Sequence, residues 1–112
     1  MLDKNCVFCR IVRGELPSAK VYEDDKMVVF SDLAPKAKVH LLAVPKDHFK
    51  LLEEADEDRA KTLAHMLLKI SEIAKSNGCN NGYRLIVNQG DYANQTVPHL
   101  HIHILGGEKL PE

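Results

Sequence analysis

Near the end of the chain, a histidine occupies every second position of an alternating run, His99-Leu-His-Ile-His-Ile-Leu105. Successive side chains of a β-strand point to opposite faces, so a strand here places His99, His101 and His103 on one face and apolar side chains on the other. The apolar face can pack on a core, while the imidazole face can border a cleft whose groups change protonation near neutral pH. The run therefore predicts a sheet that carries a histidine-lined site.

Two simpler interpretations of this run are surface histidines on an edge strand and a row of metal ligands. Half of the chain's 6 histidines fall in the run, which composition alone explains poorly. Positions on the same face lie about 6.6 to 7 Å apart along a strand, too far for all of the imidazoles to hold one ion without a bend. One histidine can therefore bind a metal while another does chemistry.

Other segments carry the apolar patterns of strands. Two short β-prone runs flank the turn Asp24-Asp-Lys26 and predict a hairpin. The expected strand segments are two within 21–32 and one each over 39–44, 83–89 and 99–105. The sheet is thus expected to have five strands.

A long helical pattern extends over 53–77, with acidic residues near its start and Gly78 as its stop. Its apolar positions recur at three- and four-residue steps and are expected to face the core: Ala60, Leu63, Ala64, Leu67, Ile70 and Ala74. A shorter helical segment is expected over 7–12. Together the patterns predict an α+β fold in one domain over residues 1–112, with a five-stranded, mainly antiparallel sheet, one long helix and a short N-terminal helix.

The composition argues against several classes of partner. With 112 residues and 45% hydrophobic content, the chain can bury one modest core. Its 15 Lys and Arg residues against 16 Asp and Glu give no long-range positive field that would gather nucleic acid or an anionic membrane. No apolar stretch approaches the roughly 20 residues of a spanning helix, and Met1–Asn5 is too polar to open a secretory signal. We expect a cytoplasmic protein that binds neither nucleic acid nor membrane.

The three cysteines are an odd count without an export signal, which argues against a disulfide framework. Cys6 and Cys9 have the spacing of one half of a zinc site, a weak signal because no second such pair exists. Two reduced thiols in a short helix are the alternative. Cys79 lies in a polar turn, and we assign it no function.

The histidine run resembles the signature of the histidine-triad nucleotide-binding proteins. Similarity extends over nearly the whole length, through Phe8–Pro17, Val39–His48, Gly82–Gly90 and Leu105–Gly107, and it points to the Hint branch. The resemblance implies the fold predicted above and a homodimer.

The resemblance also implies roles for the residues around a phosphate. It makes His101 the nucleophile, which forms a nucleotidyl-imidazole intermediate that water later hydrolyses. His103 is expected to bond a phosphate oxygen, with Thr96 near the same phosphate. His40 is expected to support the triad from the neighbouring strand.

The rest of the nucleotide site follows from the same resemblance. Asp32 is expected to accept from the two ribose hydroxyls. Phe8, Phe30 and Leu33 match the apolar walls around the base, although plain core packing also explains them.

Two loops complete the implied site. Asn88 fits a turn that lines the phosphate pocket, and Gln95 lies on the loop leading into the triad. Asn94 stands where relatives often have glycine, which bears on the backbone geometry of that loop. We expect all of them to be nucleotide-binding residues.

Bacterial members of this family complete the zinc site with two histidines, which here are His48 and His99. With Cys6 and Cys9 they would form a closed tetrahedral site, hence a structural one. No organic cofactor is implied.

The implied activity is hydrolysis of the P–N bond of a purine nucleoside 5′-phosphoramidate, which releases the nucleoside monophosphate and an amine. Cleavage of dinucleoside polyphosphates is one alternative. A nucleotide-binding or zinc-stabilised interaction module without turnover is another. The alignment of His101 beside His103 and Thr96 favours an enzyme, because binding alone needs no nucleophile.

Overall fold

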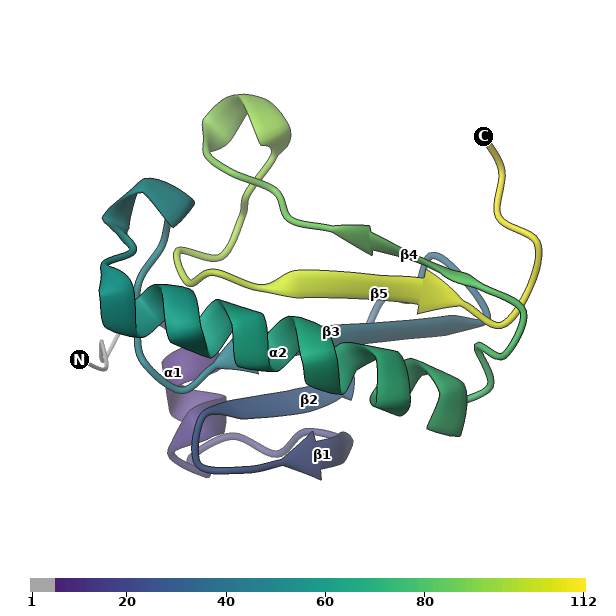
Figure 1. The fold of residues 1–112 in the computed structure, drawn as a ribbon, viewed down its shortest axis with the longest axis horizontal. Coiled ribbons are helices and arrows are strands. Elements are labelled where there is room, and N and C mark those ends of the chain that lie inside the picture. The colour runs from purple at the N-terminus through teal and green to yellow at the C-terminus, as the bar shows by residue number, and fades with distance from the viewer. Residues whose placement is uncertain (1–5) are drawn as a thin grey trace.

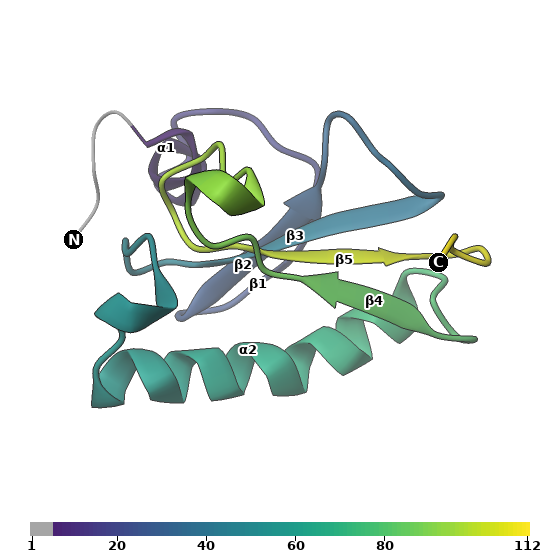
Figure 2. The same ribbon diagram turned by 90° about the horizontal axis from the view of Figure 1, so that it is seen from above.

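A computed structural model describes residues 6–112, so the expectation about a secretory signal at Met1–Asn5 lies outside the described residues. One antiparallel sheet is covered by the long helix on one face and by the short helix on the other (Figures 1 and 2). The elements are α1 (Val7–Val12), β1 (Lys20–Glu23), β2 (Met27–Ser31), β3 (Val39–Pro45), α2 (Glu57–Ser76), β4 (Tyr83–Ile86) and β5 (Ile102–Gly106). Short 3₁₀ turns, Leu52–Glu54 and Asp91–Ala93, precede α2 and follow β4.

The sheet has the strand order β1-β2-β3-β5-β4, and every neighbouring pair is antiparallel. The predicted α+β fold, its five strands and its two helices are therefore confirmed. None of the helices in the described part of the chain is long and apolar enough to cross a membrane.

The inner strands are buried on both faces, which explains their unbroken apolar runs. On the α2 face, the core is formed by Met27, Val29, Leu41, Ala43, Ile102 and Ile104 of the sheet with Met66, Ile70, Ile73 and Ala74 of α2. On the α1 face, the core is formed by Val28, Phe30, Leu42 and Val44 with Cys6, Phe8, Cys9 and Ile11. Even-numbered positions of β2 and β3 thus point toward α1, and this face carries the histidines.

Helix α2 begins where its first turn is capped. The Asp56 side chain accepts a hydrogen bond from the Arg59 backbone N–H, a cap that contributes about 1 kcal/mol. The helix ends at Ser76, and Gly78 follows with φ +94°, a left-handed conformation that suits glycine. The predicted stop and the acidic residues at the N-terminus are confirmed, but the helix begins at Glu57 instead of residue 53 because residues 52–54 form a separate 3₁₀ turn.

The apolar stripe of α2 differs from the predicted one. Ile70 and Ala74 are buried as expected, but Ala60, Ala64 and Leu67 are exposed. Met66 and Ile73 take their place in the core because the buried stripe lies further round the helix. The half-buried Leu63 and the exposed Leu67 therefore line one flank of α2.

The last strand also begins later than predicted, at Ile102 instead of His99. The chain bends at Val97-Pro98, where the His99 N–H bonds the Val97 carbonyl, and the Leu100 N–H bonds Phe49 rather than a sheet neighbour. The expectation that one strand carries the whole histidine run is therefore wrong, because only His103 lies within β5. The His99 side chain does not line the cleft that His101 and His103 line; its ring contacts Cys6 and Cys9 instead.

Candidate active site and metal cluster

A cleft of about 300 Å³ lies on the α1 face of the sheet, between α1, the end of β2 and the segment that enters β5. Its walls include Val7, Phe8, Ile11, Phe30, Asp32, Leu33, Leu42, Thr96, Val97, His101 and His103. Its lining is mostly apolar with a few polar groups, which is the usual character of a small-molecule site. A larger hollow of about 590 Å³ lies between the β1–β2 turn, the end of β3 and the first turns of α2; its lining is mainly charged, and it contains none of the predicted site residues.

His101 is buried, and its ring orientation is fixed by its own chain. Nδ1 lies 2.7 Å from the main-chain carbonyl oxygen of His99, and the ring packs edge-on against Phe8 with centroids 5.0 Å apart. A carbonyl only accepts, so the proton of the neutral imidazole sits on Nδ1. The lone pair is therefore on Nε2, the nitrogen that a nucleophile needs.

His40 and His103 form a second chain of hydrogen bonds across β3 and β5. The Lys36 backbone N–H donates to His40 Nδ1 at 3.0 Å, so His40 carries its proton on Nε2. That Nε2 lies 2.9 Å from His103 Nδ1 and 3.4 Å from an Asp32 carboxylate oxygen. His103 must then accept at Nδ1 and carry its proton on Nε2, which is buried without a partner among the described residues. The cleft thus contains one hydrogen-bond acceptor, His101 Nε2, and one donor without a partner, the Nε2–H of His103.

Burial keeps these imidazoles neutral. Burial and the adjacent rings of His101 and His40 lower the pKa of His103 to about 4. Burial also lowers the pKa of His101 and of His40, although the His99 carbonyl opposes the shift at His101 and Asp32 opposes it at His40. Near pH 7 the cleft therefore presents neutral imidazole rings, and the ring of His101 has its lone pair on Nε2.

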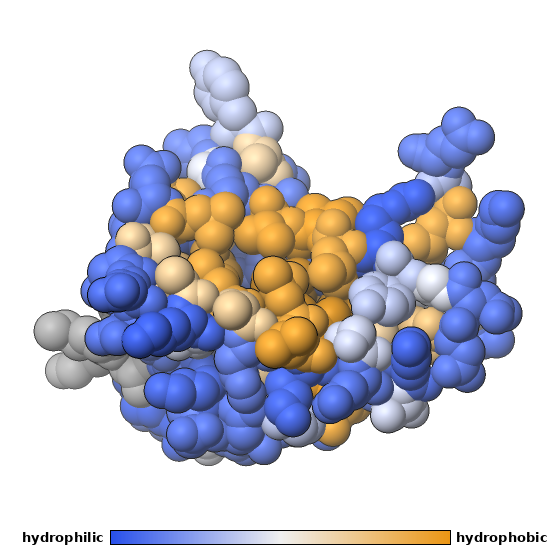
Figure 3. All heavy atoms as spheres, in the orientation of Figure 1, coloured by the Kyte–Doolittle hydropathy of each residue, from blue (hydrophilic) through white to orange (hydrophobic). Residues whose placement is uncertain are grey.

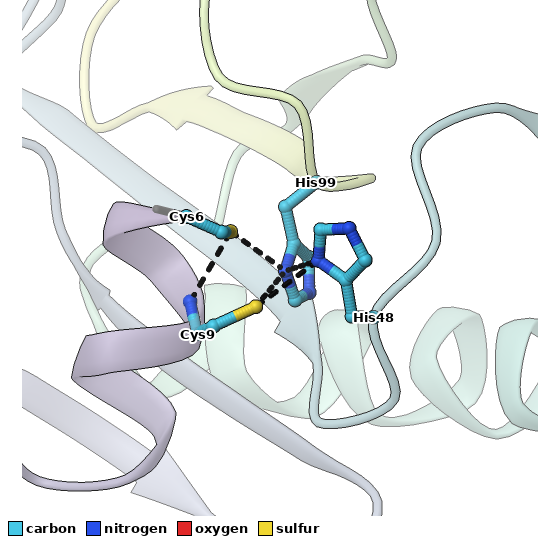
Figure 4. Close-up of side chains that lie close together, drawn as sticks. All are labelled: Cys6, Cys9, His48 and His99. Atoms are coloured by element: carbon cyan, nitrogen blue, oxygen red, sulfur yellow. Dashed lines mark hydrogen bonds between the residues drawn. The ribbon is translucent and has the colours of Figure 1, made fainter. Parts of the chain in front are cut away.

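Cys6, Cys9, His48 and His99 meet at the start of α1, each with a potential ligand atom, and these atoms lie within 4.8 Å of one another (Figure 4). His99 Nδ1 is 3.3 Å from the Cys6 sulfur and 3.4 Å from the Cys9 sulfur, and His48 Nδ1 is 3.0 Å from the Cys9 sulfur. The two Nδ1 atoms are 3.2 Å apart. These four residues can hold a metal ion.

The cluster fits a tetrahedral ion on two further counts. A tetrahedral zinc site separates its ligand nitrogens by about 3.3 Å and a nitrogen from a sulfur by about 3.5 Å, close to the spacings above. The other ring nitrogen of His99 lies 2.8 Å from the Pro45 carbonyl oxygen, to which it donates, so the lone pair is on Nδ1 and faces the sulfurs. Burial raises the pKa of the Cys6 thiol to about 11, so metal binding would release its proton.

Asp32, His40 and His103 also bring three potential ligand atoms together. Metal binding through His40 Nε2 would place the ring proton on Nδ1, facing the Lys36 N–H that already donates there. The same criterion that favours the cysteine cluster therefore argues against a metal at this second cluster.

Several predicted nucleotide-binding residues lie outside the lining of the cleft. Gln95 is buried, accepts from the Gly90 N–H and donates to the Lys50 carbonyl, so it braces the loop. Asn94 adopts φ +62°, a left-handed conformation that asparagine tolerates better than most residues, and it is exposed. Asn88 is half-buried at the end of the segment after β4.

The cleft also contains residues that sequence reasoning missed. Val7, Ile11, Ser18, Ser31 and Leu42 line it. The Ser18 hydroxyl is buried without a partner among the described residues. The alternation of β3 could have identified Leu42 as a wall, but it places Ser31 on the other face, and nothing in the sequence signals Ser18.

The fold and the cleft together define a small α+β protein with a pocket that combines buried imidazoles with an apolar lining. A family model described as "Scavenger mRNA decapping enzyme C-term binding" matches residues 5–110. Protein HitA of Neisseria gonorrhoeae is 46% identical over 102 residues, which are 91% of this chain and 95% of HitA. The chain belongs to the histidine triad (HIT) family.

Solved structures agree with this assignment. A histidine triad protein of Clostridium difficile is 44% identical with a TM-score of 0.94, and the match covers 100% of this chain and 98% of that one. A protein of Legionella pneumophila described as a HIT family hydrolase is 37% identical with a TM-score of 0.91, over 96% of both chains. The resemblance seen in the histidine run is thus confirmed at the level of the family.

Proposed function

We propose that the protein is a hydrolase that cleaves the P–N bond of purine nucleoside 5′-phosphoramidates through a nucleotidyl-His101 intermediate. The observation that carries the proposal is the fixed orientation of His101. Its Nδ1 donates to the His99 carbonyl oxygen, and the two atoms are 2.7 Å apart. This leaves a neutral Nε2 lone pair for attack on phosphorus. The hydrolase description of the Legionella relative supports the reaction type.

In the proposed first step, His101 Nε2 forms a bond to the α-phosphorus, the P–N bond breaks, and the departing nitrogen takes a proton from solvent and leaves as an amine. In the second step, water attacks the same phosphorus, the bond to His101 breaks, and a proton returns to solvent. One water is consumed and the nucleoside monophosphate is released. The unused Nε2–H of His103 would stabilise the charge that develops on a phosphate oxygen in both steps.

The cleft suggests how the nucleoside would lie. Asp32 would accept from the ribose hydroxyls at the polar side, and Thr96 would lie near the phosphate. Phe8, Phe30 and Leu33 would enclose the base, with Leu33 fully exposed until a ligand covers it. The loop near the phosphate would be shaped by Asn88, Asn94 and Gln95, and this is their only proposed role.

We also propose that Cys6, Cys9, His48 and His99 hold one Zn²⁺. Bound there, the ion would link α1 to the segments around it as a structural centre, since four protein ligands leave no position for a reacting water. The proposed location is the cytoplasm, where thiols are kept reduced and available as metal ligands.

A homodimer is the proposed assembly. β4 is an edge strand, and the flank of α2 beside it exposes apolar surface (Figure 3). Leu67 is 52% exposed and Leu85 of β4 is 37% exposed. The other edge, β1, is protected by a register shift and by ion pairs of Glu23 with Lys20 and Lys46. A second copy on the β4 edge is therefore the proposed partner.

The function is tested with adenosine 5′-phosphoramidate and diadenosine tetraphosphate, side by side. We expect turnover of the phosphoramidate by the natural chain and by Cys79→Ser, and a loss of at least about 1,000-fold in His101→Ala. A substrate with a chiral phosphorus should give net retention, because two displacements occur at one centre. Inversion, or activity that survives in His101→Ala, would overturn the mechanism. Preference for the dinucleotide would replace the proposed substrate, and absence of any turnover would leave a binding module.

A further inference from the structure

His99 belongs to the metal cluster and to the active site at once. Its Nδ1 contacts both cysteine sulfurs, and its main-chain carbonyl is the group that holds the Nδ1 proton of His101. Its Nε2 is tied to the carbonyl of Pro45 at the end of β3. The peptide unit that orients the nucleophile therefore belongs to a residue whose ring is held by the cluster.

Helix α1 connects the same two sites a second time. It starts at the cluster, where the Cys6 sulfur accepts from the Cys9 N–H, and its side chains Val7, Phe8 and Ile11 line the cleft. The Phe8 ring lies 5.0 Å from the His101 ring and 6.1 Å from the His99 ring, measured between centroids. A helix of 6 residues does not persist on its own, so its position depends on what anchors it.

We propose that the Cys6, Cys9, His48 and His99 cluster is a positioning device for catalysis, so that loading it with a divalent metal sets both the orientation of His101 and the α1 wall of the cleft. This inference rests on the proposed zinc site and the proposed nucleophile. It adds that metal loading controls nucleotide affinity and turnover, beyond holding the fold together.

The contacts explain why the effect should be large. His99 Nδ1 is an acceptor because the Pro45 carbonyl takes the proton of the other ring nitrogen. Without a cation, the cluster is therefore joined only by single hydrogen bonds, from His48 Nδ1 at 3.2 Å or from a thiol. The ring of His99 is then held firmly by the Pro45 carbonyl alone, so the chain around His99 can shift, its main-chain carbonyl can move away from His101 Nδ1, and the nucleophile loses its single tautomer. A misplacement of about 1 Å at a reacting group costs on the order of 100-fold in rate.

The first experiment compares metal-free protein, prepared with a chelator and a thiol reductant, with the same protein reloaded to one Zn²⁺ per chain. We record the ¹⁵N shifts of the His101 ring by NMR and the affinity for AMP by calorimetry, neither of which needs turnover. We expect one Nδ1–H tautomer and tighter AMP binding in the loaded form, with exchange between tautomers and a weakening of about 5-fold or more in the metal-free form. The amide spectrum of β3 and α2 shows that both forms are folded.

The second experiment separates loss of metal from loss of a side chain. His48 touches the cluster without lining the cleft, so His48→Ala should reproduce the metal-free behaviour, with turnover lowered roughly 10- to 100-fold. His48→Cys offers a replacement ligand and should recover most of the loss when zinc is added. Cys79→Ser, which removes a thiol outside the cluster, is the matched control.

The proposal is overturned if the metal-free and loaded forms share the same His101 shifts and AMP affinity, if the chain binds no zinc, or if His48→Ala equals the natural chain. Should His48→Ala fail to fold, the comparison of metal-free with loaded protein decides alone. If the metal-free and loaded forms hydrolyse the substrate equally fast, the role of the metal cluster is refuted and the proposed function is not. If AMP binding depends on the metal but no substrate is hydrolysed, the proposed function is refuted and the role of the metal cluster is not.

Discussion

His40 Nε2 lies 2.9 Å from His103 Nδ1, across the paired strands β3 and β5. Because the Lys36 N–H occupies the other ring nitrogen of His40, the proton between the two rings can come only from His40. His103 is thereby held as a donor at Nε2, on the side of the cleft. The backbone of the loop before β3 thus determines which hydrogen bond His103 can offer to the cleft.

Replacing His40 should affect the rate more than the binding. In His40→Leu, His103 is free to change tautomer, and we expect kcat to fall roughly 10- to 100-fold with AMP affinity nearly unchanged. In His40→Gln, an amide can still accept from Lys36 and donate to His103, so most of the rate should return. Steady-state kinetics of both variants check this. If the glutamine variant is as slow as the leucine variant, the hydrogen-bond chain has no such role.

Gly107, just after β5, has no room for a side chain. Its φ is +80°, and an added Cβ would lie 2.7 Å from a methyl carbon of Val39. We expect Gly107→Ala to lower the free energy of unfolding by about 2–3 kcal/mol, from backbone strain and steric overlap together. Urea denaturation measures the loss.

The matched control is Gly14, which has φ +77° but no atom within 4 Å of an added Cβ. Gly14→Ala carries the strain alone and should cost about 1 kcal/mol. Equal losses at the two positions would show that the contact with Val39 is unimportant.

The sequence was sufficient for the order and type of the elements because their signals are local. The hairpin turn, the helix stop at Gly78 and the apolar runs of β2 and β3 each depend on neighbours along the chain. The position of His99 is not local in this sense. Its ring is fixed by Pro45 and by cysteines some 90 residues away, so strand periodicity could not show that His99 lies before β5 and belongs to the cysteine cluster instead of the cleft.

The helix stripe and the cleft walls illustrate the same limit. Periodicity alone predicts that both Leu67 and Ile70 are buried. Packing against the sheet shows that Ile70 is in the core and Leu67 is exposed. Ser18 lines the cleft because α1 folds back over the sheet, a contact that no pattern in the sequence records. Family resemblance supplied the residues that spacing could not.

Asp24 fastens the β1–β2 turn to α2 and should make stability depend on pH. Its carboxylate accepts from the Tyr22 hydroxyl and from His65 Nε2, both at 2.7 Å, and from the N–H groups of Lys26 and Met27. Burial alone would raise the pKa of Asp24, but these hydrogen bonds outweigh it and hold the pKa well below its ordinary 3.8. The folded state thus binds this proton more weakly than the unfolded state does.

A depressed folded pKa contributes stability that is fully present above the unfolded pKa and is lost as the pH falls below it. We expect Asp24→Asn to lower the free energy of unfolding by about 1–2 kcal/mol at pH 7, and the gap to the natural chain to close between about pH 4 and pH 2. Urea denaturation across this range checks the trend, with the exposed neighbour in Asp25→Asn as control. A gap that persists at low pH would mean that the asparagine acts through geometry instead of charge.

The exposed flank of α2 beside β4 leads to a prediction about assembly. If a second copy covers it, Leu67→Lys and Leu85→Lys each place a charge in an apolar interface, and each should weaken the dimer at least about 10-fold. Val21→Lys makes the same change on β1, at the opposite edge of the sheet, where the exposed side chain should leave association unaltered.

Sedimentation equilibrium separates the outcomes. The natural chain and Val21→Lys should sediment as dimers at micromolar concentration, and Leu67→Lys with Leu85→Lys as a monomer that keeps its far-ultraviolet circular dichroism. A natural chain that is monomeric, or a double variant that stays dimeric, would contradict the assignment of this face. The comparison is informative because both strands are sheet edges, yet only β1 carries the register shift and ion pairs that discourage a partner strand. On β4 the lone charged residue, Arg84, is engaged with the Pro111 carbonyl, which leaves apolar side chains to meet the second copy.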